Sequence, residues 1–544
     1  MKYLNKIILG LVGLMLITVG CDTEELHELN INPQAVNEID LNYMFTAAQL
    51  GIAANGSAGD NRYTDWRTNI GLCGGYIQQL TTFGSISASG NFYRHNEESV
   101  QCIFEFSYND QLKNLAEVLK QTGVGGYAEG KLKNTVAAAR ILRAWTFFRL
   151  TDYYGAVPYF EANKGIDGIF FPTYDNQSVI YPDLLNELDE AVSSLSASNP
   201  DEGFKNADMI YQGDVDKWKR WGNSLMLRYG MRVSNVDAGM AATYVSKAVA
   251  GGVFQSNDDN VWIPMALGPS EWTNQNGISR AFYPGDGGNQ ATLGEPLINF
   301  LKGSDPNSAA DDDPRLFIMS GGLAEWSAAA WTPYPNGLDP LAQRGVPPGR
   351  YQSEVAVLLG LPADFQQYEV FSRINYLLLD DDDPYMIMNY AEVEFLLAEA
   401  LERGIGSGIS GTAQSHYEAG VRAAMQMYTP YDPSLEVSDP AVDAYLATYP
   451  YGGGGVTGSE SNLEQIAWQL WASKFLNWYD AWVDWRRKDL PPLVAYTSDD
   501  SPVTGGIIAV RLPYPNIEIA ANENFNQGSK NNYTSPVWWD GGSE

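Results

Sequence analysis

Apolar residues recur at steps of three and four along much of this chain, which is the period of an α-helix that buries one face. The longest such stretch covers residues 131–154, where Ala137, Ile141 and Phe148 fall on one stripe. No Gly or Pro interrupts it, and Gly155 follows at a position where helices commonly end. We therefore predict one long buried helix that ends just before Gly155.

The same period predicts helices in two blocks of the chain, residues 41–250 and 389–490. Within each block short loops join successive helices, which is typical of antiparallel helix pairs in a helical repeat. The predicted helices cover residues 41–54, 66–80, 100–121, 178–195, 214–234 and 241–250 in the first block, and 389–401, 412–428 and 461–487 in the second.

Between the two blocks, residues 251–388 lose the helical period. This insert is rich in Pro, Gly-containing turns and aromatic residues, and it predicts short helices, hairpins and loops. A long irregular region inside a compact protein usually carries function, so we place the ligand side here. Residues 491–544 are predicted to form a strap that lies back over a single body, residues 41–544.

The N-terminus has the pattern of a secretory signal that ends in a lipidation site. Lys2 and Lys6 precede an apolar run over 7–17 that is too short to span a membrane, and Cys21 follows small residues. We predict that residues 1–20 are removed and that Cys21 is acylated, followed by an anchored strap over 21–40. The acidic residues directly after the cysteine resemble an export signal of Bacteroidetes lipoproteins, which implies an outer-membrane, surface-exposed location.

Net charge narrows the possible partners. The chain has 66 acidic and 34 basic residues, a formal net charge of −32. Nucleic-acid binding depends on Lys and Arg at the phosphates, so a nucleic-acid partner is not expected. An anionic membrane surface would also repel the chain, so membrane contact is expected through the lipid alone.

Residues that usually mark enzymes are sparse. His27, His95 and His416 have no metal-ligand spacing, and Cys73 and Cys102 lie in apolar predicted helices, where free core thiols are favoured over a disulfide. No P-loop, dinucleotide-binding glycine motif or Gly-x-Ser-x-Gly motif is present. The pattern favours a protein without catalytic activity or cofactor. A pair of catalytic carboxylates of the glycosidase type is not excluded by the sequence, because Asp and Glu occur throughout the chain.

Two aspartate runs, 311–313 and 380–383, raise the question of structural calcium. Calcium takes several oxygen ligands, but both runs lack the alternation around a glycine that shapes a dedicated calcium loop. Solvated turns before a proline are the favoured interpretation, with calcium left open and no other metal expected.

Aromatic rings in predicted loops, close to polar side chains, are the candidate ligand contacts. Flat rings stack on the apolar faces of sugars while nearby polar groups bond the hydroxyls. The candidates are Arg62, Trp66, Arg67, Phe83, Tyr93, Trp272, Asn274, Tyr283, Trp326 and Trp331. Five further tryptophans follow helical spacing and are predicted to pack between helices: Trp468, Trp471, Trp478, Trp482 and Trp485.

Several stretches, in order, resemble the SusD/RagB family of nutrient-binding outer-membrane lipoproteins, especially its second SusD-like branch. They are ARILRAWTFFRLTDYYGAVPYFE (139–161), SVIYPDLLNELDEAVSSL (178–195), GDVDKWKRWGNSLMLRYGMRVS (213–234), DDPRL (312–316), MNYAEVEFLLAEAL (388–401), HYEAGVRAAM (416–425), WVDWRRKDLPPL (482–493) and RLPYP (511–515).

This resemblance implies an all-α body of four tetratricopeptide-like helix pairs with an irregular ligand-side insert. It also implies a non-enzymatic lid that captures oligosaccharides or peptides for a SusC-like TonB-dependent transporter. Family ligand contacts lie on variable loops, so none is carried over to this chain. Two alternatives stay open: a secreted glycoside hydrolase on a helical scaffold, and a structural transporter lid without its own ligand.

Overall fold

The computed structural model describes residues 38–53, 62–84, 88–201, 203–268, 274–284, 291–327 and 330–544. The signal peptide, Cys21 and Trp272 therefore lie outside the described residues. Contacts within the chain separate residues 1–41 from a compact unit, residues 42–544, which holds the helices of the body and the candidate sites. Within the described ranges, no helix has both the length and the apolar content to cross a membrane.

The central element is helix α7 (Lys133–Tyr154), as predicted. Nearly all of its 22 residues are buried, so it is enclosed on every side rather than along one stripe. It ends at Gly155, whose φ of +83° is a conformation that glycine adopts at little cost. The Gly155 N–H donates to the carbonyl of Thr151 at 2.8 Å and completes the last turn.

Successive helices pack side by side, starting from α7. Helix α8 (Gln177–Ser194) packs on α7, α10 (Val215–Arg232) packs on α8, and α11 (Ala238–Gly251) packs on α10. Asp214 caps α10 by accepting from the N–H groups of its first turn, because its carboxylate satisfies donors that have no helical partner.

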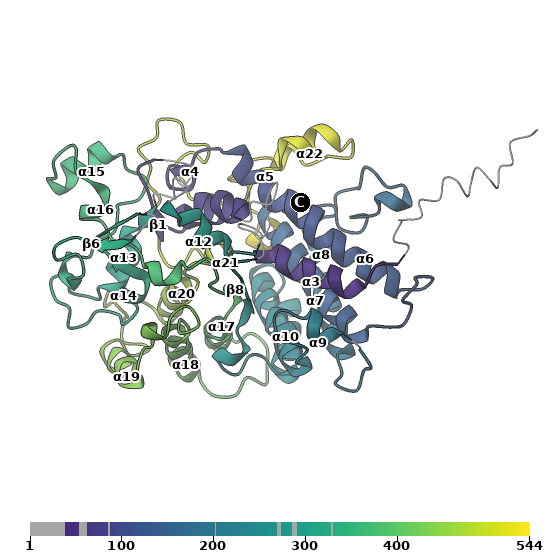
Figure 1. Ribbon diagram of the computed structural model, residues 1–544. Helices are drawn as coiled ribbons and strands as arrows, with labels where there is room; N and C mark the ends of the chain where they lie inside the picture. Colours follow the sequence, from purple (N-terminus) through teal and green to yellow (C-terminus); the bar gives the residue numbers. More distant parts are fainter. Residues whose placement is uncertain are drawn as a thin grey trace, which may run out of the picture. The chain divides into compact units, whose positions relative to one another are not determined.

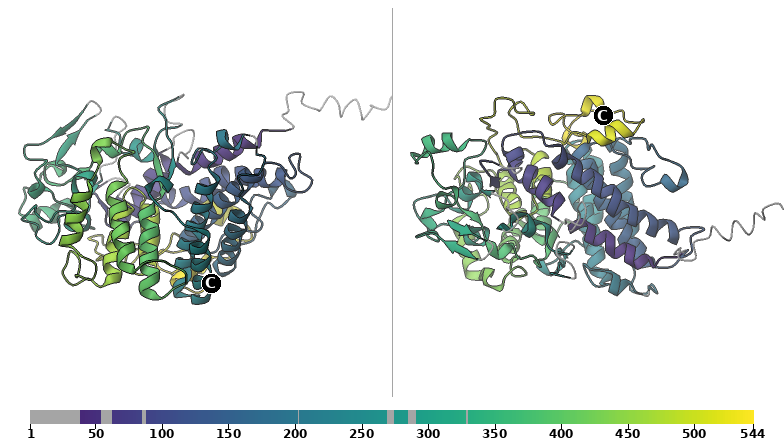
Figure 2. Two further views of the ribbon diagram at one scale, coloured as in Figure 1. Left: turned by 90° about the horizontal axis from the view of Figure 1, so that it is seen from below. Right: turned by 45° about the horizontal axis from the view of Figure 1, so that its top comes forward.

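The second block continues the same arrangement. Helix α17 (Tyr390–Arg403) packs on α10 and on α18 (Ala413–Gln426), and α20 (Asn462–Ser473) packs on both α17 and α18. The left view of Figure 2 shows these helices, coloured green to teal, standing in one row. The predicted helical-repeat body is therefore confirmed, although residues far apart in the sequence join its two halves.

One predicted helix is divided. Residues 461–487 form α20 and a separate α21 (Trp478–Arg486), because Leu476 takes a left-handed φ of +76° and the Asn477 side chain caps the start of α21. The apolar period continues across the break, so periodicity alone gave no sign of it.

Short elements complete the body (Figure 1). Within the described residues, the other α-helices are α3 (Leu41–Ala53), α4 (Ala88–Asn91), α5 (Glu97–Phe106), α6 (Lys113–Thr122), α9 (Phe204–Ala207), α12 (Gly277–Phe282), α13 (Glu295–Leu301), α14 (Leu316–Met319), α15 (Gln352–Leu359), α16 (Gln367–Val370), α19 (Asp439–Thr448) and α22 (Asn516–Ala521). Two segments are π-helical: η2 (Asp65–Gly74) and η3 (Ser107–Leu112). Cys73 and Cys102, in η2 and α5, are buried and free, as predicted.

The described strands are short and pair antiparallel in twos, mostly within the insert, so the body is mostly helical as predicted. The pairs are β1 (Leu80–Thr81) with β3 (Thr292–Leu293), β2 (Val261–Ile263) with β8 (Tyr385–Met388), β4 (Ser320–Gly322) with β7 (Arg373–Ile374), and β5 (Ala324–Trp326) with β6 (Trp331–Pro333).

A buried charge network joins the two halves of the body. Arg228 on α10 donates to Glu392 on α17 at 2.6 Å, and Lys474, directly after α20, lies 2.8 Å from the same carboxylate. Lys474 also lies 2.8 Å from Asp484 on α21, which Arg232 of α10 contacts at 2.8 Å. These five side chains are at most 7% exposed, so each charge depends on the others.

The two arginines on one face of α7 have different partners. Both are expected from sequence to reach carboxylates on a neighbouring helix. Arg140 does so, through two hydrogen bonds to Glu187 of α8 at 2.8 and 2.9 Å. The expectation is wrong for Arg143, whose guanidinium instead lies over the rings of Phe147 and Tyr159 at 4.8 and 5.1 Å.

The C-terminal segment lies against the end of α7. The Leu512 N–H donates to the Tyr153 carbonyl at 2.9 Å, and the Tyr514 hydroxyl donates to the Tyr154 carbonyl at 2.7 Å. The Trp539 indole donates to the buried Asp152 carboxylate at 2.7 Å. These bonds attach the C-terminal segment to the last turn of the central helix.

Close helix packing at Gly222 gives a test of the α8–α10 contact. A Cβ atom at Gly222 would lie 2.3 Å from a methyl group of Val192. We expect Gly222→Leu to lower the free energy of unfolding by about 1–3 kcal/mol, because the stiff valine cannot move aside. Denaturant unfolding would measure this. Gly239→Leu is the control, because Gly239 is exposed in the first turn of α11. An equal loss of stability there would contradict the packing argument.

Candidate functional site

Three aromatic rings gather on the β5–β6 hairpin and the chain beside it. Trp326 and Trp331 face each other across the hairpin, with ring centroids 6.0 Å apart. Trp331 also stacks on Tyr376 at 5.3 Å and an interplanar angle of 29°. The two tryptophans are partly exposed and Tyr376 is 39% exposed, so solvent reaches this group. We call these three rings, together with Tyr368 and Arg373, the hairpin cluster.

Neighbouring residues hold these rings in place. Gly321 leaves room for Trp331, since a Cβ atom there would lie 2.6 Å from the indole. The Asn375 side chain donates to the Phe317 carbonyl at 2.9 Å and accepts from the Leu377 N–H at 3.1 Å, which fixes the short turn that carries Tyr376. The β4–β7 pairing then places Arg373 beside the hairpin.

Arg373 brings hydrogen-bond donors to the cluster. Its guanidinium carbon lies 3.9 Å from the centroid of Tyr368 and 5.7 Å from that of Trp331. The side chain is 6% exposed, and burial lowers its pKa. Arg315 is equally enclosed but pairs with Asp313 at 2.6 Å, whereas Arg373 has no ion-pair partner in the described part of the chain. Its N–H groups are therefore free to bond oxygen atoms of a ligand.

The side chains of the hairpin cluster are of the kinds that contact a ligand. The cluster offers flat ring faces and guanidinium donors, and exposed Glu325 and Glu369 lie on β5 and α16. None of its five members supplies a nucleophile paired with a base. This combination suits a ligand with apolar ring faces and hydroxyl or anionic groups.

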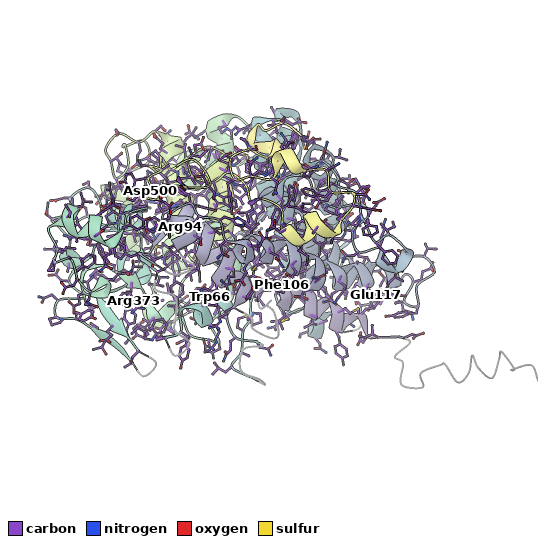
Figure 3. All side chains as sticks on the ribbon, turned by 90° about the horizontal axis from the view of Figure 1, so that it is seen from above. Trp66, Arg94, Phe106, Glu117, Arg373 and Asp500 are labelled. Carbon is purple, nitrogen blue, oxygen red and sulfur yellow. The ribbon has the colours of Figure 1, made fainter. Side chains whose placement is uncertain are left out.

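A second aromatic group lies at the start of η2. The ring of Trp66 lies between Arg62 and Arg67, whose guanidinium carbons are 5.0 and 4.7 Å from its centroid. Arg67 also pairs with Glu98 at 2.6 Å. Trp66 is partly exposed, so these three predicted contacts do lie together. Figure 3 shows Trp66 and Arg373 at separate positions toward the lower edge of that view.

Two predicted ligand contacts pack against other aromatic rings. Phe83 packs edge-on against Phe365 and Phe371, with centroids 5.8 and 6.1 Å away. Tyr93 is 1% exposed and stacks on Tyr76. The prediction is therefore wrong for Tyr93, whose ring is buried, whereas Phe83 is partly exposed and remains a candidate. Composition cannot reveal which of the two rings is covered.

The remaining candidates lie at the edges of the insert. Asn274 is partly exposed and donates to the Gly268 carbonyl at 3.1 Å. Tyr283 is partly exposed and lies under Arg280 at 5.1 Å. It follows α12, which packs on η2, the segment that carries Trp66. Both remain candidates.

Three members of the hairpin cluster were not predicted from the sequence: Tyr368, Arg373 and Tyr376. Arg373 and Tyr376 flank Asn375, a polar residue between two apolar stretches, which gave a weak turn signal. Nothing in the sequence indicated that this turn lies beside the hairpin, because that contact depends on the β4–β7 pairing.

The aspartate runs have protein partners. Asp313 pairs with Arg315, and Asp311 accepts hydrogen bonds from Ser304 and Tyr449 at 2.7 Å. In the described ranges, no three His, Cys, Asp or Glu side chains are grouped so as to hold a metal ion. The structure therefore gives the calcium hypothesis no grouped ligands there.

The second aspartate run gives a pH prediction. Burial, strengthened by neighbouring carboxylates, raises the pKa of Asp383 to about 7. Because this folded pKa exceeds the unfolded value of about 4, the fold binds the proton more tightly and loses stability as pH rises from about 4 through 7. Asp383→Asn should raise the melting temperature at pH 8 by about 2 °C and flatten its decline between pH 5 and 8.

Asp364→Asn is the control for this prediction, because Asp364 is exposed and is not one of the carboxylates that act on Asp383. Thermal unfolding followed by circular dichroism at several pH values makes the comparison. Equal slopes against pH for wild type and Asp383→Asn would contradict the assignment.

Comparison with known proteins identifies the family. A sequence model described as "Starch-binding associating with outer membrane", of the SusD-like type, matches residues 33–318 and 346–515. This chain belongs to the SusD-like family. The match omits residues 319–345, the segment that holds both hairpin tryptophans, so family likeness does not account for them.

Solved structures agree with this assignment to the SusD-like family. A chitin-binding protein is 28% identical with a TM-score of 0.74, and the match covers 92% of this chain and all of that chain. A SusD-like protein of Bacteroidetes is 25% identical with a TM-score of 0.76 and the same coverage. A SusD homologue from Parabacteroides distasonis, at 22% identity and a TM-score of 0.72 over 93% of this chain and 99% of that one, shares the fold. No curated protein matched.

The family is associated with the outer membrane and includes starch- and chitin-binding proteins, which indicates a carbohydrate-binding role for this SusD-like chain. The helical fold and the hairpin cluster both fit such a role.

Proposed function

We propose that this SusD-like protein captures oligosaccharides at the hairpin cluster, anchored at the cell surface through Cys21, and passes them to a SusC-like TonB-dependent transporter. The observation that carries the proposal is the stack of Trp331 on Tyr376 beside the unpaired Arg373. Stacking faces bind the apolar side of a pyranose, and guanidinium donors bind its hydroxyls.

Two comparisons support a carbohydrate over a peptide as the ligand. The 28% identical relative is described as a chitin-binding protein, and the matching family is described as starch-binding. The two tryptophans of the cluster lie in the segment that the family model does not match, so they are suited to select a particular glycan. We expect the Trp66 group to add a second contact for a longer chain.

The protein is proposed to bind its ligand without changing it. The hydrolase alternative requires two carboxylates about 5–10 Å apart in a cleft that holds the substrate. The hairpin cluster contains no carboxylate of its own, and its neighbours Glu325 and Glu369 are exposed, where a raised catalytic pKa is hard to maintain.

The test uses residues 22–544 as a soluble protein against a panel of polysaccharides, oligosaccharides and peptides. Calorimetry should detect a glycan ligand, and chromatography should recover that glycan uncleaved. Turnover would overturn the binding proposal, and a peptide as the only ligand would overturn the choice of carbohydrate. Co-purification of the lipidated chain with an outer-membrane transporter tests the partner.

A further inference from the structure

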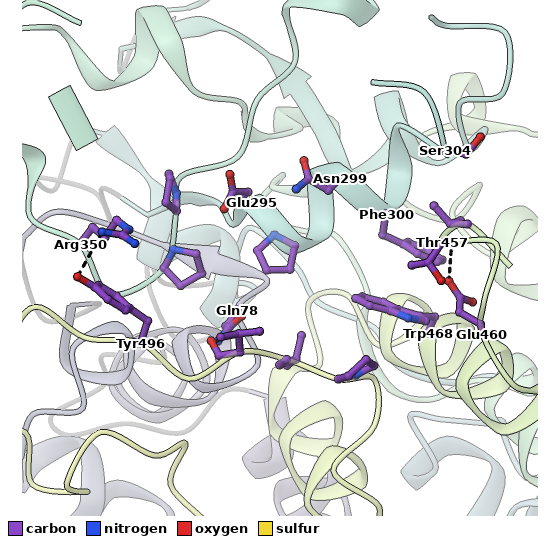
Figure 4. Close-up of a pocket in the computed structure, with 18 residues that line it drawn as sticks. Gln78, Glu295, Asn299, Phe300, Ser304, Arg350, Thr457, Glu460, Trp468 and Tyr496 are labelled. Carbon is purple, nitrogen blue, oxygen red and sulfur yellow. Dashed lines mark hydrogen bonds between the residues drawn. The ribbon is translucent and has the colours of Figure 1, made fainter. Parts of the chain in front are cut away.

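A cavity of about 530 Å³ lies between α13, α20 and the extended chain on either side of them (Figure 4). Its volume falls within the range of small-molecule sites. None of the residues that line it belongs to the hairpin cluster or to the Trp66 group, so it is a separate place in the fold. Most of its wall is apolar, including prolines at 296, 347, 348 and 492.

A pair of stacked rings closes one end of the cavity. Phe300 of α13 and Trp468 of α20 lie 5.3 Å apart at an interplanar angle of 8°. The sequence predicted that Trp468 packs between helices like Trp471 and Trp478, which are at most 3% exposed. Trp468 does pack against α13 through Phe300, but it is also partly exposed to the cavity, and among the described residues its buried indole N–H has no acceptor.

A carboxylate that has no ion-pair partner in the part of the chain that the structure describes lies at the same end. Glu460 accepts the Thr457 N–H at 3.0 Å, which orients its side chain (Figure 4). Burial raises its pKa, backbone bonds partly offset that rise, and the nearby charge that acts on it is another acid, Glu464. The buried Glu392 and Glu399, in contrast, have arginine and lysine partners. A carboxylate next to aromatic rings is the combination that binds an ammonium group.

The other end of the cavity carries groups that suit hydroxyls. Arg350 lies over the ring of Tyr496 at 4.0 Å and donates to its hydroxyl at 3.2 Å. Glu295 lies between the two ends in Figure 4 and forms no hydrogen bond from its carboxylate within the described residues. Donors and acceptors are therefore spaced along an apolar wall.

We infer that this cavity is a second ligand site, which binds a short oligosaccharide carrying a free amino group. The protonated amine pairs with Glu460 beside Trp468 and Phe300, and the ring hydroxyls bond Glu295, Arg350 and Tyr496. The net charge of −32 favours a cationic ligand over an anionic one. The choice of a sugar as the carrier rests on the proposed function; the recognition of the amine rests on the cavity alone.

The experiment titrates residues 22–544 with a β-1,4-linked glucosamine tetramer and, separately, with its fully N-acetylated form. Glu460→Gln keeps the acceptor for Thr457 but removes the charge, and it is expected to weaken glucosamine tetramer binding at least tenfold. Glu295→Gln is the second cavity variant. Tyr43→Ala, an exposed ring outside both sites, is expected to leave glucosamine tetramer affinity within twofold, and Trp331→Ala is titrated alongside it to register binding at the hairpin cluster. Circular dichroism confirms that each variant is folded.

The outcomes separate this inference from the proposed function. Loss of glucosamine tetramer binding with Glu460→Gln but not with Tyr43→Ala, together with a smaller effect on the N-acetylated tetramer, supports the cavity. No binding of the glucosamine tetramer to wild type, or a loss that follows Trp331 alone, overturns it. Equal weakening of both tetramers by Glu460→Gln overturns the recognition of the amine. A lysine-containing tripeptide that displaces the tetramer with higher affinity overturns the sugar as carrier.

Discussion

Glu392→Ala is expected to lower the free energy of unfolding by about 3–5 kcal/mol, or to prevent folding altogether. Glu392 is 1% exposed and accepts from Arg228, and Lys474 lies 2.8 Å from its carboxylate. Removing this carboxylate leaves two buried cations short of a partner. Their desolvation is then uncompensated, which costs more than an ordinary hydrogen bond contributes.

Glu187→Ala on α8 is the matched control for that experiment. Glu187 also pairs with an arginine, Arg140, but both side chains are about a fifth exposed, so its loss should cost no more than about 1 kcal/mol. Denaturant unfolding of the two variants in parallel measures the difference. Similar losses would show that the network does not hold the two halves of the body together.

Trp331→Ala is expected to lower the affinity of this protein for its glycan ligand about 10- to 100-fold, which corresponds to a loss of about 1.4–2.7 kcal/mol in binding free energy. The Trp331 indole stacks on Tyr376 and lies beside Arg373, so its removal takes away the central ring of the hairpin cluster. Stability should change by less than about 1 kcal/mol, because the ring lies on a partly exposed hairpin. Calorimetry and thermal unfolding of the same sample separate the two effects.

Tyr43→Ala is the control for ring loss as such, since Tyr43 is an aromatic residue 72% exposed and outside the cluster. Tyr376→Ala should repeat the effect of Trp331→Ala. If both cluster variants bind as tightly as wild type while folded, the ligand does not contact the hairpin. The Trp66 group or the cavity between α13 and α20 would then be the places to test.

The exposure of aromatic rings at the candidate site could be predicted from the sequence only in part. Trp326 and Trp331 were candidates because they lie in an irregular segment, and they do meet on one hairpin. Tyr93 carried a similar signal but is buried. Exposure of a loop ring depends on which distant segment covers it, and no local pattern records that segment.

The sequence by itself determined the helices, their arrangement in packed pairs and the irregular insert. A stripe of apolar residues with helical period indicates which face of each helix is buried, and it can be recognised within one segment of the chain. It also determined the family, whose motifs recur in order along the chain. The tertiary structure alone decided the break between α20 and α21, the charge network and the placement of Arg373 beside Trp331. Each of these depends on contacts between residues far apart in the chain, and such contacts leave no periodic mark in a single sequence.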